Sequence, residues 1–479
     1  MRANAQLARL AERLFPGSSY DELLVSPSVA VHVHQAEERI QQECEIARQI
    51  FGGGAWADLR HSLAESLAWM LLFRVPGHRL QVSIDSWIQA QCEMLERLVS
   101  DRAEIEVRFG RDARQIVSLD LDLSDRHNGR TVAAVTFNSG LRLIYKPRDL
   151  SIDSWFVEFQ ARLNELGAPL PFQTLQFLTR EGYGWTEFAT HAHCRSEEQL
   201  QRFYRNAGAL LCILHLLRAT DCHFENLIAC GEHPVLVDAE TLFQPSLSSA
   251  TETLSVLRTG MLPRPSPLLS PSGASAADLG ALSALTAQTV PVPIPALNGD
   301  RDRLETAMLI PDTNVPLPPG YELNPNLYVE EMVDGFRQTW QFAQEHRGAI
   351  LHAIDAASEK SIRYVFRDTL SYYQSIVAAL YAGRLEGLTL PSLTGAKTAF
   401  APLEASELFI LRQLDIPRFT LCVADTSLGN AAGCFPVSGY DLVRTGIEGM
   451  CDEEMEKQAG ILRVCWGLYG AAKFLVPAV

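Results

Sequence analysis

One segment of the chain combines an acid, an amide and a second acid at a spacing that suits phosphoryl transfer. The string Asp221-Cys-His-Phe-Glu-Asn226 is followed by an apolar run, Pro234 to Val237, and then by Asp238-Ala-Glu240. A kinase needs one Asp to accept the hydroxyl proton, and an Asn and another Asp to hold Mg²⁺ against the phosphates of ATP. Mg²⁺ prefers oxygen ligands, so its candidate ligands are Asn226, Asp238 and Glu240. Asp221 is then the candidate proton acceptor.

A site of this kind also needs a cation and a loop that covers the phosphates. Lys146 ends a predicted strand, as the phosphate-binding lysine of a kinase does. The loop 125–130 lies between two predicted strands, but it has one glycine where a protein kinase has three, and its Asp125 would repel phosphate unless a cation intervened. Taken alone, Asp-x-His-x-x-Asn is more typical of a capped turn. The order of these features along the chain favours the kinase-like site. That order is strand, loop, strand, Lys, helix, Asp/Asn loop, strand and Asp.

Two further positions are candidates for contacts around the nucleotide. Trp185 and Glu187 lie where a kinase hinge would flank the adenine, although a tryptophan here is equally consistent with a core residue. Glu158, on a predicted helix, is a candidate ion-pair partner of Lys146.

Hydrophobic periodicity predicts an α+β fold with a small antiparallel sheet. Apolar and polar residues alternate over 117–123, and further strands are predicted over 131–137 and 141–146, with polar turns between them. Helices are predicted over 153–166 and 197–218. Ser196 and Gln199 form a capping box at the start of the second helix.

The pattern divides the chain into three regions. Residues 1–100 form a helical region, 101–187 a kinase-like small lobe, and 188–479 a mainly helical large lobe. Residues 245–325 hold 13 of the 25 prolines, which indicates a long irregular excursion. The triplet at 52–54 is assigned to an interhelical turn, because no strand precedes it as a dinucleotide loop requires.

Composition excludes several classes of partner. The chain has 479 residues with 41 Lys+Arg against 57 Asp+Glu, and a net charge of −16 disfavours nucleic acid and anionic membranes. Apolar runs are too short to span a bilayer and no secretory core begins the chain, so we expect a soluble, cytoplasmic protein. The ten cysteines form no C-x-x-C pair and are expected to be reduced and mostly buried. The pair His191 and His193, next to Cys194, is assigned to a loop rather than to a metal cluster.

Five strings resemble the class II lanthipeptide synthetases. They stand in the family's order and cover roughly residues 103–419. The strings are 124–148, 220–229, 237–243, 255–263 and 415–419.

This resemblance implies an ATP- and Mg²⁺-dependent dehydratase with a two-lobed fold similar to lipid kinases and with added helical elements. By match to the family's motifs, Asp221 and His223 would lie in the catalytic loop, and Lys146 would contact phosphate. The metal would be bound by Asn226, Asp238 and Glu240. The phosphate-covering loop would contribute Asp125, His127 and Asn128.

A dehydratase must also eliminate the phosphate that it transfers. Planar arginine suits phosphate because it donates two parallel hydrogen bonds. Arg363 and Thr369 resemble the family's elimination pair, although the bare string is also typical of a basic helix face. The base that removes the α-proton stays open between Lys146 and His127 or an acid of its loop.

The partner implied is a ribosomal precursor peptide with its leader. Three alternatives stay open for the rings, namely a separate cyclase that acts afterwards, a truncated chain, and a natural product whose dehydrated residues stay uncyclised. Full-length members carry a C-terminal zinc cyclase whose motifs are missing here, so we expect no zinc and no ring formation by this polypeptide. The alternatives are a phosphotransferase without productive elimination and an inactive peptide-binding scaffold.

Overall fold

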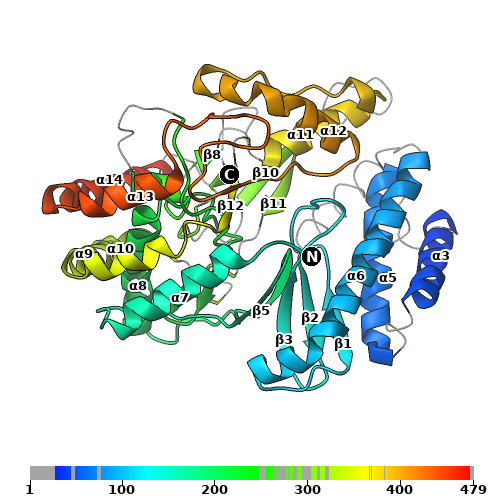
Figure 1. Cartoon of the computed structure of the whole chain (residues 1–479), viewed down its shortest axis with the longest axis horizontal. Coiled ribbons are helices and arrows are strands. Elements are labelled where there is room, and N and C mark those ends of the chain that lie inside the picture. The colour runs from blue at the N-terminus through cyan, green and yellow to red at the C-terminus, as the bar shows by residue number, and fades with distance from the viewer. Residues whose placement is uncertain are drawn as a thin grey trace.

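The computed structural model shows a sheet flanked by helices beside a larger, mainly helical body (Figure 1). It describes residues 27–44, 49–72, 77–247, 255–263, 265–266, 277–278, 280–283, 288–293, 304–309, 313–318, 323–365, 367, 369–381 and 383–474.

A five-stranded antiparallel sheet has the order β1-β2-β3-β5-β4. The first three strands confirm the predicted strands with shorter bounds, and β4 and β5 extend the sheet beside β3. The strands are β1 (Ile116–Asp120), β2 (Ala133–Phe137), β3 (Arg142–Lys146), β4 (Phe177–Arg180) and β5 (Tyr183–Glu187). The sheet therefore carries Lys146 at the end of its central strand.

Three helices form a layer against this sheet, namely α3 (Pro27–Glu43), α5 (Gly53–Leu72) and α6 (Gly77–Phe109). Their buried residues share one apolar cluster with β1, β2 and β3. The glycine triplet 52–54 lies in close contact with β1. The Gly52 N–H donates to the Ile116 carbonyl (2.7 Å), and a Cβ at Gly54 would lie 2.4 Å from the Val117 carbonyl oxygen. The predicted turn at 52–54 is therefore also a contact with β1, and α5 begins inside it.

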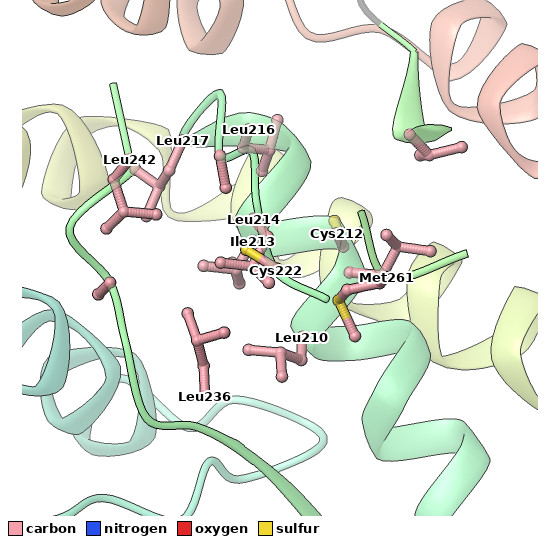
Figure 2. Packing of buried hydrophobic residues seen from close by; sticks show 14 of the residues in the cluster. Leu210, Cys212, Ile213, Leu214, Leu216, Leu217, Cys222, Leu236, Leu242 and Met261 are labelled. Carbon is pink, nitrogen blue, oxygen red and sulfur yellow. The ribbon is translucent and has the colours of Figure 1, made fainter. Parts of the chain in front are cut away.

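The larger body is built around α8 (Glu197–Leu216) and α9 (Val329–Glu345). The predicted cap is confirmed, because the Gln199 N–H donates to the Ser196 hydroxyl (3.3 Å). Apolar side chains of α8 pack beneath the segment that follows it, as Leu210, Cys222 and Leu236 show in Figure 2. The other helices and the hairpin of this body are α7 (Ser151–Glu165), β6 (Leu227–Cys230), β7 (His233–Leu236), α10 (Arg347–Asp355), α13 (Gly439–Glu448) and α14 (Asp452–Phe474).

A two-stranded ribbon and two helices connect the two parts. The ribbon pairs β12 (Ser361–Tyr364) with β13 (Phe419–Cys422), and α11 (Thr369–Tyr381) and α12 (Glu404–Arg412) lie between these strands in sequence. Buried residues of α11 and α12 join the same apolar cluster as the N-terminal helices. The region predicted as one large lobe, 188–479, therefore also contributes to the core around the sheet.

The proline-rich excursion lies partly outside the described residues. Within its described pieces β8 (Pro265–Ser266) pairs with β9 (Ala277–Asp278), and β10 (Gln288–Pro293) with β11 (Leu304–Leu309), which the composition did not predict. The ten cysteines, all of them among the described residues, form no disulfide, and five of them are buried. Among the helices of the described chain, none is long and apolar enough to cross a membrane.

Candidate active site

The loop 221–226, which we call the catalytic loop, follows the buried end of α8 and has a strained conformation. Asp221 has a left-handed backbone with φ of 60°. The Asn226 side-chain amide donates to the Asp221 carbonyl (2.8 Å), and the Asn226 carbonyl accepts the Val237 N–H (2.9 Å). These bonds close the loop onto the end of β7 and bring Asp221, Asn226 and Asp238 together as predicted.

The Asp221 carboxyl group is suited to accept a proton. Burial raises its pKa, and the nearby His223 and Arg363 oppose that rise. His223 Nε2 lies 3.7 Å from an Asp221 oxygen. A perturbed pKa in such a setting is typical of catalytic groups.

Lys146 reaches from β3 to the residues after β7. Its Nζ donates to the Val237 carbonyl (2.5 Å) and lies 3.6 Å from Asp153 and 4.0 Å from Asp238. The predicted pairing of Lys146 with Glu158 is wrong, because Glu158 accepts a hydrogen bond from Ser154 at the exposed side of α7 (3.1 Å). Asp153, five residues earlier on the buried face of α7, takes that role.

Arg148 links the two carboxylates that also face Lys146, those of Asp153 and Asp238. Its guanidinium donates to both Asp153 oxygens (2.6 and 2.9 Å) and to Asp238 Oδ1 (2.6 Å). One Asp238 oxygen is thus held by arginine, and Oδ2 faces Lys146.

Glu240 lies among three arginines, a group we call the arginine cluster. Arg363 donates to its Oε1 (3.0 Å), Arg418 to its Oε2 (2.7 Å), and Arg148 lies 3.2 Å from Oε2. These guanidinium groups hold the pKa of Glu240 well below its usual value, against the effect of burial. Because both oxygens are engaged by arginine, this structure does not support the prediction that Glu240 is a metal ligand.

The loop 124–130, which we call the phosphate loop, lies against Asp415 and Ile416. The His127 ring binds the Ile416 carbonyl through Nδ1 (2.8 Å), and the Gly129 N–H donates to Asp415 (3.0 Å). Asp125 accepts a hydrogen bond from the Tyr373 hydroxyl on α11 (2.8 Å).

The conformation of this loop requires its glycine. Asn128 and Gly129 have φ values of 53° and 74°, and a Cβ at Gly129 would lie 1.9 Å from the Ser86 Oγ. Burial and the charge of Arg363 lower the pKa of His127. The loop therefore presents a neutral imidazole toward the arginine cluster.

The predicted hinge residues have different surroundings. The Trp185 ring is completely buried, and its indole N–H donates to Asp101 (2.9 Å). Its placement supports the core interpretation and contradicts a direct contact with adenine. Glu187, at the end of β5, is half-buried and accepts a hydrogen bond from the Gln176 N–H (3.2 Å).

The predicted elimination pair is only partly brought together. Arg363, on β12, donates from its backbone N–H to the Glu240 carbonyl (2.7 Å), which fixes β12 beside the catalytic loop. Thr369 is the first residue of α11 and is half-buried. Within the described chain no contact joins its side chain to Arg363. Arg367, between them, instead pairs with the buried Glu407 (2.9 Å).

The residues present fit a magnesium ion at one position. Among the described residues no three His, Cys, Asp or Glu side chains form a metal-binding group. Asn226 and Asp238 are neighbours with oxygen donors, and Mg²⁺ typically uses one or two such ligands together with phosphate oxygens and water. This pair would hold the ion when nucleotide is bound.

A known protein family covers the part of the chain that holds the candidate site. The family described as "Domain of unknown function (DUF4135)" matches residues 75–422, which include every candidate site residue. The chain belongs to this family. It is also similar to the lacticin 481/lactococcin biosynthesis protein LcnDR2 of Lactococcus lactis subsp. lactis, with 25% identity over 422 residues. That match covers 80% of this chain and 45% of the relative, so this chain spans less than half of the relative's length.

These two matches confirm the resemblance to the dehydratase region of class II lanthipeptide synthetases. Sequence reasoning missed three residues of the site, namely Arg148, Asp153 and Arg418. Two of them carried a signal, since Arg148 and Arg418 each follow a proline inside a string that resembles the family.

Proposed function

We propose that this DUF4135 chain is a dehydratase of lanthipeptide biosynthesis that phosphorylates Ser and Thr residues of a precursor peptide and then eliminates the phosphate. The observation that carries the proposal is the position of Arg363. It contacts Glu240 and lies close enough to Asp221 and His127 to influence the pKa of both. A proton acceptor for phosphorylation and a cation for the leaving phosphate thus share one site.

In the phosphorylation step the hydroxyl oxygen of the peptide attacks the γ-phosphorus of ATP, and Asp221 accepts the hydroxyl proton. The bond between the γ-phosphorus and the bridging oxygen breaks, and ADP leaves with the electron pair. Lys146 and the phosphate loop bind the phosphates. Asn226 and Asp238 would hold Mg²⁺, which would neutralise the charge of the phosphates. The small antiparallel sheet and the mainly helical body are consistent with a two-lobed fold like that of lipid kinases, which we propose for this chain.

In the elimination step a base removes the Cα proton of the phosphorylated residue. The electron pair forms the Cα=Cβ bond, and the Cβ–O bond breaks so that phosphate leaves with both of its electrons. His127 is favoured as the base. A carbonyl can only accept, so the bond to Ile416 places the proton on Nδ1 and the lone pair of the neutral ring on Nε2.

The test is a reaction of the purified chain with ATP, Mg²⁺ and the Ser/Thr-rich peptide encoded beside its gene, read by mass spectrometry. Loss of water from the peptide supports the dehydratase. A stable phosphoryl adduct would instead support a phosphotransferase without productive elimination, and an unchanged peptide would support an inactive scaffold. Alkylation of the product's cysteines tests the expectation that this polypeptide forms no rings, because free thiols gain the label.

A variant separates the two steps. We expect Arg363→Ala to accumulate phosphopeptide, since it removes the guanidinium that binds the leaving phosphate. The matched control is Arg444→Ala, which removes an arginine that pairs with Asp355 on the surface (2.7 Å). Wild-type amounts of dehydrated product from Arg363→Ala would reject the elimination role.

A further inference from the structure

We propose that Arg418 is a second phosphate-binding residue and that it forms, together with Arg363, an arginine pair for the leaving phosphate. The inference rests on the function proposed above. It assigns to Arg418 a direct contact with the phosphate, and to Glu240 the positioning of both guanidinium groups.

The ribbon β12–β13 places the two arginines on one face. Arg363 lies opposite Thr420 in the antiparallel register. Side chains two residues apart on a strand share a face, so Arg418, just before β13, is the diagonal neighbour of Arg363. Tyr364 points to the opposite face, where its ring packs on Phe400 and Phe435. The ribbon therefore separates a charged face from an apolar one.

Glu240 fixes the distance between the two guanidinium groups. Arg363 binds one carboxylate oxygen (3.0 Å) and Arg418 the other (2.7 Å). Each arginine uses one terminal nitrogen in this contact. A guanidinium has five N–H donors, and no other described residue accepts a hydrogen bond from the remaining donors of either side chain. These donors are available to an anion.

Exposure and unused donors distinguish this pair from Arg148. Arg148 is only 10% exposed, and together with Lys146 it faces the carboxylates of Asp153 and Asp238. Arg363 and Arg418 converge on Glu240, which Arg148 also approaches, and their side chains are 13% and 21% exposed. Arg148 is thus a structural ion pair, whereas Arg363 and Arg418 retain free donors and access.

Two guanidinium groups match the chemistry of the departing group. When the Cβ–O bond breaks, the phosphate gains the electron pair and with it a further negative charge. Charge-assisted hydrogen bonds from two planar guanidinium groups stabilise this charge more than those from one group can. Arg418 would donate to phosphate oxygens that Arg363 does not reach.

The experiment starts from the same precursor peptide made with phosphoserine at one Ser position, so that elimination is followed without the kinase step. Arg418→Ala is expected to lower the rate of elimination roughly a hundredfold and Arg418→Lys roughly tenfold. Lysine keeps the positive charge but cannot donate two parallel hydrogen bonds. The loss should include a raised KM for the phosphopeptide and weaker product inhibition by inorganic phosphate. Phosphorylation of the unmodified peptide should fall far less. Arg444→Ala is the control.

The outcomes separate this inference from the function on which it rests. If wild-type protein leaves the phosphopeptide intact, the proposed function fails whatever Arg418 does. If wild type eliminates phosphate and both Arg418 variants match it, only the second arginine is rejected. Equal losses of phosphorylation and elimination, or unchanged inhibition by phosphate, would show a structural role and also overturn the inference. Thermal unfolding of Arg418→Lys excludes loss of the fold as the cause.

Discussion

The catalytic loop and the arginine cluster are neighbours that hold their carboxylates in opposite electrostatic conditions. The Thr220 N–H, next to the loop, donates to the carbonyl of Thr241, next to Glu240 (3.1 Å). Burial raises the pKa of Asp221, whereas three guanidinium groups hold the pKa of Glu240 well below its usual value. Asp221 therefore keeps an affinity for a proton, and Glu240 stays ionised. One carboxylate is suited to proton transfer and the other to positioning cations.

The two regions also differ in how they are assembled. The catalytic loop is one run of six residues, closed by the bond from the Asn226 side chain to the Asp221 carbonyl. The arginine cluster gathers side chains from four segments that lie as far apart as 148 and 418 in the sequence. A change in the loop should therefore affect chemistry first, and a change in the cluster should affect both stability and chemistry.

The largest effect is expected from Asp221→Asn. The amide keeps the size of the side chain but cannot accept the hydroxyl proton, so we expect phosphorylation to slow by a factor of about 10³ to 10⁴. Initial rates of transfer from γ-labelled ATP measure this. Glu225→Gln, at an exposed position of the same loop, is the matched control. A rate within a few-fold of wild type would remove Asp221 from the role of proton acceptor.

A smaller effect, on stability, is expected from Glu240→Gln. Three arginines would lose the charge that they converge on, and breaking a buried ion pair from one side costs roughly 3 kcal/mol. We expect the free energy of unfolding in denaturant to fall by this amount at neutral pH. Glu104→Gln, which changes an exposed pair with Arg180, should alter it by less than about 1 kcal/mol.

The stability of Glu240→Gln relative to wild type should also depend on pH. Since the pKa of Glu240 is depressed in the folded state, its contribution is present above the unfolded value of about 4.3 and is lost as pH falls through the folded value. The difference between wild type and Glu240→Gln should therefore shrink in strong acid. A difference that is independent of pH would contradict the ionised role of Glu240.

Sequence reasoning was most successful where a function occupies one continuous segment. The strands that end at Lys146, the cap at Ser196 and the grouping of Asp221, Asn226 and Asp238 follow from local periodicity and from short-range order along the chain. Each of these features depends on neighbours in sequence, which is the information that a pattern contains.

The features that could not be predicted from the sequence depend on contacts between distant segments. Nothing local distinguishes Asp153 from Glu158 as the partner of Lys146, because only the packing of α7 decides which face of that helix is buried. The environment of Glu240 likewise exists only after β12 and β13 pair beside it. Trp185 fits either a hinge or a core until its contact with Asp101 is known.

The smallest effect is expected on the pH dependence of phosphorylation, where charges of the arginine cluster act on Asp221 of the catalytic loop. Asp221 must be ionised to accept a proton, so the rate falls as pH drops through its pKa, which burial raises above the ordinary value. The negative charge of Glu240 contributes to that rise, and the positive charge of Arg363 opposes it. The acid limb of kcat/KM should therefore move to lower pH in Glu240→Gln and to higher pH in Arg363→Gln. Glu104→Gln should leave the limb in place. Shifts in the same direction for both cluster variants would mean that the cluster acts on the loop through conformation rather than through charge.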